Sequence, residues 1–573
     1  MPSSSLSLKL ISSLLLLSPS ALSFTPCPLL GPAFPPFQLD PSSKELSKAF
    51  KELKHELDDQ IISGNGSHGV TYPKTTTFSL SLFSTNEGPA SDGPFMFDYH
   101  YTAPAQKQSK DFRAADANSV YRIGGLSQIF TIWTLLASAD DGVLADPVAK
   151  YLPELGTAKK DADGLVEWDL VTVGQLASHM AGIARDSCVS DSNAEVHSVH
   201  GLQKSPDSFP LCTSLSEEDA LARLAQQKPA AFPDSTPLYS NMGFEVLGYV
   251  IQNITGQSFE EALQETILSP LGLNETSLNR PSNSSMGIIP ANETASGWKN
   301  EYGGAAPAIS MFSSITDLSL AGKAILNSTL LSHIETKRWL NPVTHTSNPA
   351  NSIGYPWIIY SGGEYPNTSM VDTYTYYSDI GLYSSYLGLV PDYNVGFAIL
   401  AADSIASPDL NAHADIIGDI ILGALISTAT NQAGENFGGG YRASDNSSLI
   451  AVSADKLPGL FIEDFVSNGA NFRKTLASLT GVQDSDDLSI RLYPTGLISQ
   501  TKSGSKQTFR AVLQDKTELA DNGTPTCVSF LDVGKLKYND ASLDEFIFDV
   551  NKDGAAVGVE IPALGVTLKR SQD

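Results

Sequence analysis

The residues YRIGGLSQIFT, numbers 121–131, decide the fold, because they begin a mostly helical stretch that extends to about residue 330. On both sides of this stretch the pattern changes to short apolar runs rich in β-branched and aromatic residues, which are typical of strands. The predicted strands cover 75–83, 95–101, 353–360, 374–377, 384–390 and 395–401. Strands at both ends with helices between them predict an α/β unit whose terminal segments complete one antiparallel sheet.

Apolar residues at helical spacing predict two further helices. One covers residues 43–62, where apolar side chains recur every three or four positions. The other covers 409–427 and is expected to pack on the sheet. Its apolar run, 416–425, is interrupted by Asp419, so we interpret it as a core helix and not as a membrane span.

The first 23 residues read as a secretory signal peptide. Lys9 supplies a positive charge, residues 10–17 form a short apolar core, and Ala21-Leu22-Ser23 is a small-x-small cleavage site. The apolar core is too short to cross a bilayer. The sequence therefore predicts a secreted, extracellular protein.

Downstream of residue 23 the chain is expected to contain a lead-in and two domains. Residues 24–43 are rich in proline and predict an extended lead-in, and the α/β unit then covers 44–430. A run of three glycines marks 431–440 as a linker. Beyond it, residues 441–573 predict a small all-β domain with strands at 448–452, 460–465, 489–493, 508–513, 526–532 and 546–550.

Composition excludes one large class of partners. The 573 residues are 41% hydrophobic and 9% aromatic, which is enough for a large core and argues against intrinsic disorder. The formal net charge is -27, and no run of Lys or Arg offsets it. Such a field repels phosphates, so nucleic-acid binding is excluded. The oligomeric state stays open.

Four cysteines remain in the chain after the signal peptide, and secretion favours their pairing in disulfides. Three connectivities are possible. We favour Cys188–Cys212, which closes a polar, loop-like insertion, and by elimination Cys27–Cys527, which ties the N-terminus to the C-terminal domain. Four buried free thiols are the alternative.

The chain also has about twice as many N-x-S/T sequons as its composition would give, which predicts a glycoprotein. The acceptor residues are Asn65, Asn253, Asn274, Asn283, Asn292, Asn327, Asn367, Asn446 and Asn522.

The region from about 44 to 430 resembles the serine β-lactamase and penicillin-binding-protein family, in particular its class C-like branch. The resemblance rests on the order and spacing of several stretches, none of them specific alone. They are Tyr121-Arg122-Ile123-Gly124 with Phe130-Thr131; Asp146-Pro147-Val148 with Lys150-Tyr151-Leu152-Pro153; Leu176-Ala177-Ser178-His179-Met180-Ala181-Gly182; Tyr239-Ser240-Asn241 with Gly243-Phe244 and Leu247-Gly248; and Gly381-Leu382-Tyr383-Ser384-Ser385 with Pro391-Asp392-Tyr393.

This resemblance implies a β-lactamase/transpeptidase-like fold, in which an antiparallel sheet carries helices on both faces and a helical subdomain. The all-β C-terminal domain resembles the one appended to secreted fungal members. The family acts through a Ser-x-x-Lys motif at the start of a buried helix, where the lysine amine reaches the serine hydroxyl one turn away and the serine attacks an acyl carbon. A Tyr-x-Asn motif adds a proton-transfer group, and a Lys-x-Gly or His-x-Gly strand motif adds a cation.

The sequence departs from the family pattern at the positions that carry the chemistry. Gly125 stands where the serine is expected and Gln128 where the lysine is expected. The strand motif is altered too, with Tyr376 at the cation position and Ser378 at the glycine position. An amide accepts no proton near pH 7. Ser127 is no substitute, because two helix positions turn it by about 200° to another face.

Only Tyr239-Ser240-Asn241 survives from the catalytic motifs, so Tyr239 and Asn241 are the remaining candidate catalytic residues. Tyr239 has two interpretations that stay open, a packed tyrosine or a ligand contact. The same holds for Tyr376 and Tyr377, as pocket-lining aromatics or plain strand residues. We expect a structural role for His179.

No metal site or cofactor is expected. Residues 549–560 fit the EF-hand calcium pattern, but a strand-like run precedes them and Ile561-Pro562 cannot continue a helix. The segment Asn551-Lys552-Asp553-Gly554 is more simply a hairpin turn. The other Ser-x-x-Lys, Ser503 to Lys506, lies in a Gly/Ser turn and begins no helix.

Two functions remain compatible with the sequence, so its status as an enzyme is open. The first is a pseudoenzyme that binds a small molecule or peptide in its cleft without acylation. The second is a repurposed enzyme that uses Tyr239 as acid or base, acting as a hydrolase, esterase or acyltransferase, for example in secondary metabolism. Function depends on the site and not on the fold, so geometry has to decide between them.

Overall fold

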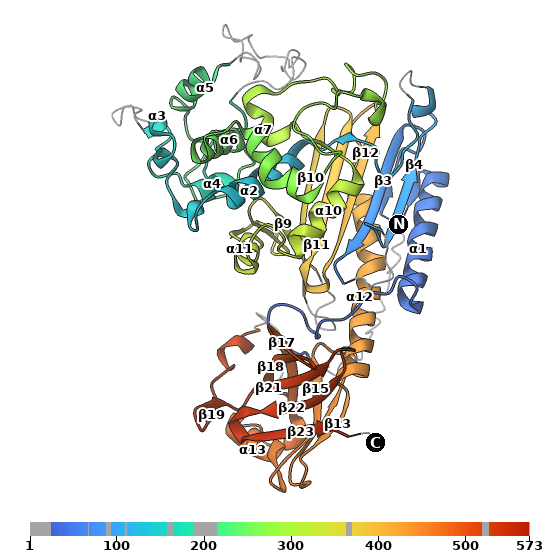
Figure 1. The fold of residues 1–573 in the computed structure, drawn as a ribbon, viewed down its shortest axis with the longest axis vertical. Coiled ribbons are helices and arrows are strands. Elements are labelled where there is room, and N and C mark those ends of the chain that lie inside the picture. Colours follow the sequence, from blue (N-terminus) through green and yellow to red (C-terminus); the bar gives the residue numbers. More distant parts are fainter. Residues whose placement is uncertain are drawn as a thin grey trace, which may run out of the picture. The chain divides into compact units, whose positions relative to one another are not determined.

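The computed structural model describes residues 24–66, 68–86, 93–108, 112–156, 164–187, 215–362, 370–517 and 527–571. The chain forms two compact units (Figure 1). The main unit comprises residues 36–363 and 370–429, and the C-terminal unit comprises residues from Thr430 onward together with the N-terminal residues up to Pro35.

An eight-stranded antiparallel sheet forms the centre of the main unit. Its spatial order is β4 (Phe97–Tyr101), β3 (Thr76–Ser84), β12 (Val395–Asp403), β11 (Tyr383–Val390), β10 (Val371–Ile380), β9 (Ile358–Gly362), β8 (Asn351–Ile353) and β7 (Thr344–His345). The N-terminal strand β3 pairs with β12 over its whole length, from Thr76 opposite Asp403 to Ser84 opposite Val395. The predicted antiparallel sheet, completed by both ends of the unit, is therefore confirmed.

Helices cover both faces of this sheet, as predicted (Figure 1). Alternate residues of β3 point to opposite faces. Ser81 meets Ser319 of α10 (Ile315–Leu326) on one face, with 2.9 Å between their hydroxyl oxygens. Phe78 packs edge-on against His413 of α12 (Asn411–Phe437) on the other face. Helix α1 (Lys44–Ser63) also lies on the α12 face, because its Phe50 stacks on Phe97 of β4.

The helical subdomain lies beside the α10 face. Its main helices are α2 (Ser127–Ser138), α4 (Val173–Ala177), α5 (Glu217–Leu224), α6 (Asn241–Thr255), α7 (Phe259–Leu263), α9 (Ala306–Ile309) and α11 (His333–Trp339). They share one hydrophobic core with the sheet, in which Trp133 of α2 packs against Trp339 of α11. This core holds the start of α2 against the sheet, where the altered motif lies.

The boundary between the two units lies at Ala429/Thr430, next to the predicted linker 431–440, but residues 431–437 are helical because α12 continues to Phe437. Buried side chains recur every fourth residue along this helix, from His413 through Ile421 and Ala429 to Phe437. That buried stripe outweighs the weak helix propensity of the Asn and Gly residues near its end. By length and composition α12 could cross a bilayer, but half of its most apolar stretch is buried inside the structure.

The C-terminal unit is all-β, as predicted, and its sheet closes into a barrel. Its sheet has the order β14 (Leu449–Ser453), β13 (Gly439–Arg442), β23 (Val566–Arg570), β22 (Ala556–Ile561), β21 (Glu545–Asn551), β18 (Gly504–Asp515), β17 (Leu488–Thr501), β15 (Leu460–Ser467) and β16 (Ala470–Asn471), and pairing of β14 with β15 closes it. Helix α13 (Phe472–Thr480) lies within this domain and was not predicted.

One predicted strand of this domain, 526–532, is wrong. Residues Ser529–Leu531 form a single 3-10 turn, and the apolar side chains of Val528, Phe530 and Leu531 are exposed. The alternation of apolar and polar residues in this segment therefore does not correspond to a strand with one buried face. The residues of the calcium-like pattern form the predicted hairpin, with β21 ending at Asn551 and β22 beginning at Ala556.

The predicted Cys27–Cys527 disulfide is confirmed and lies within the C-terminal unit. It joins residues 500 positions apart. Close by, the backbone N–H of Cys27 donates to the Gln514 side chain of β18 at 2.9 Å. The other predicted pair, Cys188 with Cys212, lies outside the described residues.

Replacing both Cys27 and Cys527 by serine should destabilise the C-terminal unit by about 2–4 kcal/mol, because the crosslink restricts the unfolded chain. Urea unfolding followed by far-UV circular dichroism would measure this loss. Tryptophan fluorescence provides an internal control, since all five tryptophans, at 133, 168, 298, 339 and 357, belong to the main unit. Unchanged transitions in both signals would contradict the prediction.

Candidate functional site

The site is built where the start of α2 meets β10. A 3-10 turn, Gly124–Leu126, leads into α2, so Gly125 lies just before the helix and Gln128 lies in its first turn. Gly124 has φ +51°, and a Cβ there would come within 2.7 Å of the Ser378 hydroxyl oxygen. Only glycine fits this close approach of turn and strand.

The backbone N–H of Gly125 is not free, because it donates to Oγ of Ser378 at 2.6 Å. An N–H at the start of a helix points away from the helix body and is suited to hold an oxygen or anion of a ligand. Here a side chain of the protein itself occupies that donor. Ser378 stands at the position where the resemblance implies glycine, and glycine would leave the donor open.

Tyr239 and Asn241 lie at the N-terminus of α6. Ser240 caps this helix, because its hydroxyl accepts from Gly243 N–H at 3.0 Å and donates to the Ala184 carbonyl at 2.6 Å. The cap fixes the backbone on both sides of Ser240. Tyr239 and Asn241 are thereby held with their side chains directed at α2.

Gln128 is the centre of the hydrogen-bond network. Its amide nitrogen donates to the Tyr239 hydroxyl at 2.9 Å and to the Asn241 side-chain oxygen at 3.2 Å. Its amide oxygen accepts from the Tyr376 hydroxyl at 2.5 Å. Asn241 in turn donates to Asp186 at 2.8 Å. The carboxamide thus joins α2 to β10 and to the start of α6.

His179 fixes the direction of this network. Its Nδ1 accepts from the backbone N–H of Ser240 at 3.2 Å, which leaves the ring proton on Nε2. Nε2 lies 3.1 Å from the Tyr376 hydroxyl and donates to it, so Tyr376 donates onward to Gln128. His179 therefore orients the hydroxyl of the buried Tyr376.

Burial keeps the titratable groups of the site neutral. It lowers the pKa of His179 from its usual value of 6.5 to about 3. Burial also raises the pKa of Tyr239 from 10 to about 12, although the Arg185 guanidinium, 4.5 Å above its ring, opposes the rise. The pKa of Tyr376 is raised well above its ordinary value by burial. None of the three is matched to proton transfer near pH 7.

Two hydroxyls stand close in front of Gly125. A Cβ placed on Gly125 would lie 3.0 Å from the Ser378 hydroxyl oxygen, 3.0 Å from the Tyr239 hydroxyl oxygen and 3.3 Å from the Ser378 Cβ. A serine there would be crowded by Ser378 and within reach of Tyr239. The residues that would surround a nucleophile are therefore in place, but glycine stands at the nucleophile position.

The structure brings together Gly125, Gln128, Tyr239, Asn241, Tyr376 and Ser378, the six motif positions singled out in the sequence. Tyr377 is half-exposed and stacks on Tyr386, on the other face of the sheet. Ser127 is fully buried, donates to the Gly124 carbonyl and accepts from Met311 N–H. Lys506 forms ion pairs with Glu560 and Asp549 in the C-terminal barrel.

Sequence reasoning missed three features of the site. It read Gln128 only as a lost base, did not foresee the Ser378 contact with Gly125, and gave Asp186 no role. The only signal for these contacts was the joint replacement of four motif positions, Gly125, Gln128, Tyr376 and Ser378. Within the described part of the chain, no group of three or more His, Cys, Asp or Glu residues could hold a metal ion.

Comparison with known families matches both units of the chain. The family model described as "Beta-lactamase" matches residues 97–420, more than half of the chain. A second model, "Beta-lactamase-like-like, C-terminal domain", matches residues 429–572.

Curated fungal proteins are similar over most of the chain. A "Beta-lactamase-like protein" from Arthroderma benhamiae is 28% identical over 566 residues, which cover 91% of this chain and 92% of that protein. "Probable hydrolase M10" from a Phoma species is 23% identical and covers 86% of this chain and 85% of its own length. Among solved structures, a beta-lactamase/D-alanine carboxypeptidase from Yersinia pestis, complexed with citrate, is 16% identical with a TM-score of 0.49, over 67% of this chain and all of that one.

The free energy of unfolding of the main unit should fall as the pH decreases from about 7 to about 4.5. The pKa of His179 is lower in the folded state than in the unfolded chain, so the unfolded chain binds its proton more tightly. Stability is therefore full above about pH 6.5 and is lost towards the folded pKa of about 3. His179 should contribute about 2–3 kcal/mol to this fall.

Urea unfolding monitored by tryptophan fluorescence at both pH values would test this. A His179→Phe variant should show a smaller fall, whereas His345→Ala, at an exposed position, should keep the wild-type fall. Equal falls for wild type and His179→Phe would contradict the assignment.

Proposed function

The chain belongs to the beta-lactamase family, and from the state of its pocket we propose that it is a non-acylating member that binds a small molecule or peptide in the cleft. The observation that carries this proposal is the occupation of the Gly125 N–H by the Ser378 hydroxyl at 2.6 Å. A carbonyl oxygen under attack needs such a donor in the transition state. The site thus lacks the nucleophile and the base that the family's reaction needs, and its backbone donor is already occupied.

No neighbouring hydroxyl replaces the nucleophile. Ser127 is fully buried and held by two hydrogen bonds. The Ser378 hydroxyl accepts the Gly125 N–H, and no basic side chain among the described residues is hydrogen-bonded to it. An alcohol without an adjacent base is a weak nucleophile. This supports a site that does not form an acyl-enzyme.

The repurposed-enzyme alternative, with Tyr239 as acid or base, has less support. Tyr239 has a pKa raised to about 12, and its oxygen already accepts a hydrogen bond from Gln128 at 2.9 Å. A general base should have a pKa near the operating pH. Because the Tyr239 oxygen already accepts a hydrogen bond, the hydrogen of its own hydroxyl is available for donation. We therefore assign Tyr239 the role of a hydrogen-bond donor to the ligand.

The directions of these hydrogen bonds indicate which polar groups a ligand should carry. The Tyr239 hydroxyl oxygen lies 3.0 Å from where a Gly125 Cβ would stand, and the Ser378 hydroxyl oxygen approaches that point to the same distance from the strand. Arg185 stacks on the Tyr239 ring and pairs with Asp186 at 3.7 Å, so this edge of the site carries both charges. A hydroxyl donor suits a carbonyl oxygen of an uncharged ligand.

We also propose that the protein is a secreted glycoprotein. Seven of the nine sequon asparagines lie in the described residues, and all seven are exposed: Asn65, Asn253, Asn274, Asn283, Asn292, Asn327 and Asn446. Asn367 and Asn522 lie outside the described residues. The Cys27–Cys527 disulfide suits an oxidising compartment. The apolar N-terminal 23 residues would direct export.

An activated ester or a fluorescent penicillin should leave the wild-type protein unlabelled, as measured by intact mass. The triple variant Gly125→Ser, Gln128→Lys, Ser378→Gly should gain a covalent adduct on residues 121–131, because it restores the nucleophile, its base and the free N–H. The double variant that retains Ser378 should react about 10²-fold more slowly, since one oxyanion donor stays occupied. A wild-type adduct within 121–131 would overturn the proposal.

Expression of the full-length chain in a fungal host should release the protein into the medium. Its mass should fall on treatment with an N-glycosidase, and peptide mapping should find the mature N-terminus near Phe24. Mutation of the exposed acceptor Asn253 to Gln should remove one glycan and leave the fold unchanged. Retention of the whole product inside the cells, with no glycan, would refute secretion.

A further inference from the structure

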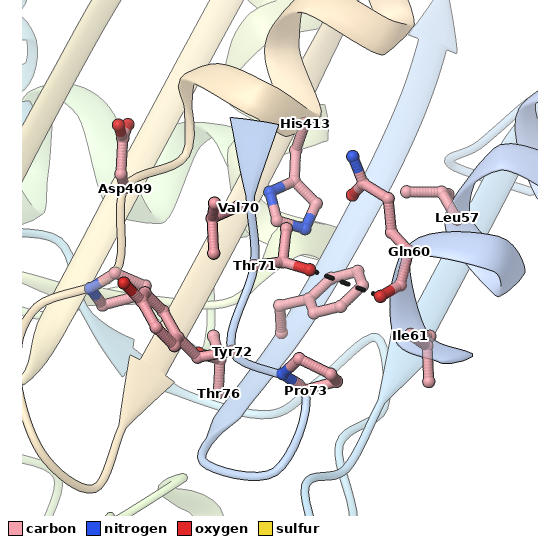
Figure 2. A pocket seen from close by; sticks show the side chains of 12 residues that line it. Leu57, Gln60, Ile61, Val70, Thr71, Tyr72, Pro73, Thr76, Asp409 and His413 are labelled. Atoms are coloured by element: carbon pink, nitrogen blue, oxygen red, sulfur yellow. Dashed lines mark hydrogen bonds between the residues drawn. The ribbon is translucent and has the colours of Figure 1, made fainter. Parts of the chain in front are cut away.

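The hollow between the end of α1, residues 70–73, β3 and the start of α12 is too small for an organic ligand (Figure 2). It has room for only about one or two water molecules. Within it, the Thr71 hydroxyl donates to the Gln60 carbonyl at 3.4 Å. The C-terminal unit offers a surface for a larger partner, because one strand of its barrel has an open edge.

The second half of β17 forms this open edge. β15 pairs with only two residues of β17, both in its first half, and among the described residues no strand continues on that side. From Gly496 to Thr501 every residue is exposed, with the side chains of Leu497 and Ile498 at 66% and 45% exposure. The opposite side of this segment is paired with β18. We refer to residues 496–501 as the β17 edge.

The direction of the backbone groups in β18 fixes their direction in β17. The Thr508 carbonyl of β18 accepts from the Thr495 hydroxyl of β17 at 2.9 Å, so this carbonyl points to β17. In a strand every second residue points its N–H and C=O to the same side. Lys506 therefore also bonds to β17, where its register partner is Ser499. Ser499 thus directs its own backbone groups to β18.

The two neighbours of Ser499 direct their backbone groups the other way. The N–H and C=O groups of Ile498 and Gln500 point to the open side, where the described part of the chain places no strand. Such unpaired groups are a template for another strand, and proteins usually protect them with charged side chains or proline. The β17 edge has neither protection, since residues 495–501 are uncharged and contain no proline.

The β17 edge is complementary to an antiparallel copy of itself. Its two outward residues, Ile498 and Gln500, are spaced symmetrically around Ser499. A two-fold axis at Ser499 therefore places Ile498 opposite Gln500 of the second copy, and both backbone groups of each residue can bond across the axis. In this register Lys502, the first charged residue after the edge, lies opposite Gly496 of the second copy and meets no charge.

Charge restricts where two copies of the chain can touch. The formal net charge of -27 makes the copies repel each other. A contact through the uncharged β17 edge places no like charges directly opposite each other, which would be destabilising across paired strands. An acidic or basic partner, by contrast, would find no charged side chain on this edge to bind. The edge therefore suits a second copy better than a charged peptide.

We propose that two copies of this chain form a transient two-fold dimer in which their β17 edges pair as antiparallel strands. The paired edges join the sheets of the two barrels into one. A contact of two short strands is smaller than a standard stable interface, so the dimer is weak and depends on protein concentration. The proposal is independent of the ligand proposed for the cleft, because it uses only the C-terminal unit.

Sedimentation velocity of the purified full-length chain from about 10 μM to about 0.5 mM tests the proposal. The monomer should give way to a dimer with a dissociation constant of about 10⁻⁴ M, as suits a small transient interface. Higher salt should strengthen the dimer, because it screens the repulsion between the acidic copies. A monomer at every concentration and salt condition would overturn the proposal, and so would a dimer that salt dissociates.

Charge substitutions at Ser499 locate the interface. Ser499→Lys and Ser499→Glu each place two like charges across the two-fold axis and should weaken the dimer at least about tenfold. An equal mixture of the two variants should restore it, because a mixed dimer has opposite charges at the axis. Thr567→Lys adds the same charge at an exposed position of β23, which is paired on both sides, and should keep the wild-type affinity.

Ile498→Pro provides an independent variant in case the Ser499 substitutions disturb the barrel. Proline at 498 removes an N–H that points to the open side and no hydrogen bond between β17 and β18. The variant should keep the wild-type far-UV circular dichroism and should weaken the dimer at least about tenfold, since a donor of the interface is lost. Wild-type affinity in a folded Ser499→Lys or Ile498→Pro variant, or a mixture of the two Ser499 variants that stays monomeric, would refute the assignment.

Discussion

The hydrogen bonds of the Gln128 carboxamide determine what this site can do. This one group accepts from Tyr376 and donates to Tyr239 and Asn241, and thereby joins a helix start, a strand and a second helix start. A lysine amine could make the donated bonds but could not accept from Tyr376. The carboxamide therefore keeps these side chains connected, but it offers no basic nitrogen that could accept a proton near pH 7. Ser378 completes the change by accepting the Gly125 N–H.

Much of the fold could be predicted from sequence because it depends on short-range patterns. The strands of the main sheet are runs of apolar residues with clear ends, and strand β3 pairs with β12 despite their separation, as the strand-helix-strand order implied. The flanking Arg122-Ile123-Gly124 and Phe130-Thr131 also set the register of Gly125 and Gln128 in the sequence, and the structure places both residues at the start of α2. What these positions do to one another was not predictable, because Ser378 and Gly125 are 253 residues apart.

Where local structure differs from the predictions, the burial or exposure of side chains differs from what the sequence pattern suggests. Residues 431–437 contain Asn, Gly and Gln and were read as a linker, yet Ala433 and Phe437 extend the buried stripe of α12. Residues 526–532 alternate like a strand, yet Phe530 and Leu531 face solvent. His179 was given a structural role without a partner, and its two ring nitrogens in fact bridge the α6 cap and Tyr376. Tertiary context overrode local preference in each case.

The bond between Cys27 and Cys527 has a consequence for the order of events during synthesis. The ribosome adds Cys527 500 residues after Cys27. At roughly 5–20 residues per second, Cys527 follows Cys27 after about half a minute to two minutes. During that time the main unit is synthesised, while the Cys27 thiol cannot yet pair with Cys527. Oxidation with the correct partner is thus confined to the end of translation, and premature pairing with another cysteine is the hazard that nascent-chain quality control would have to correct.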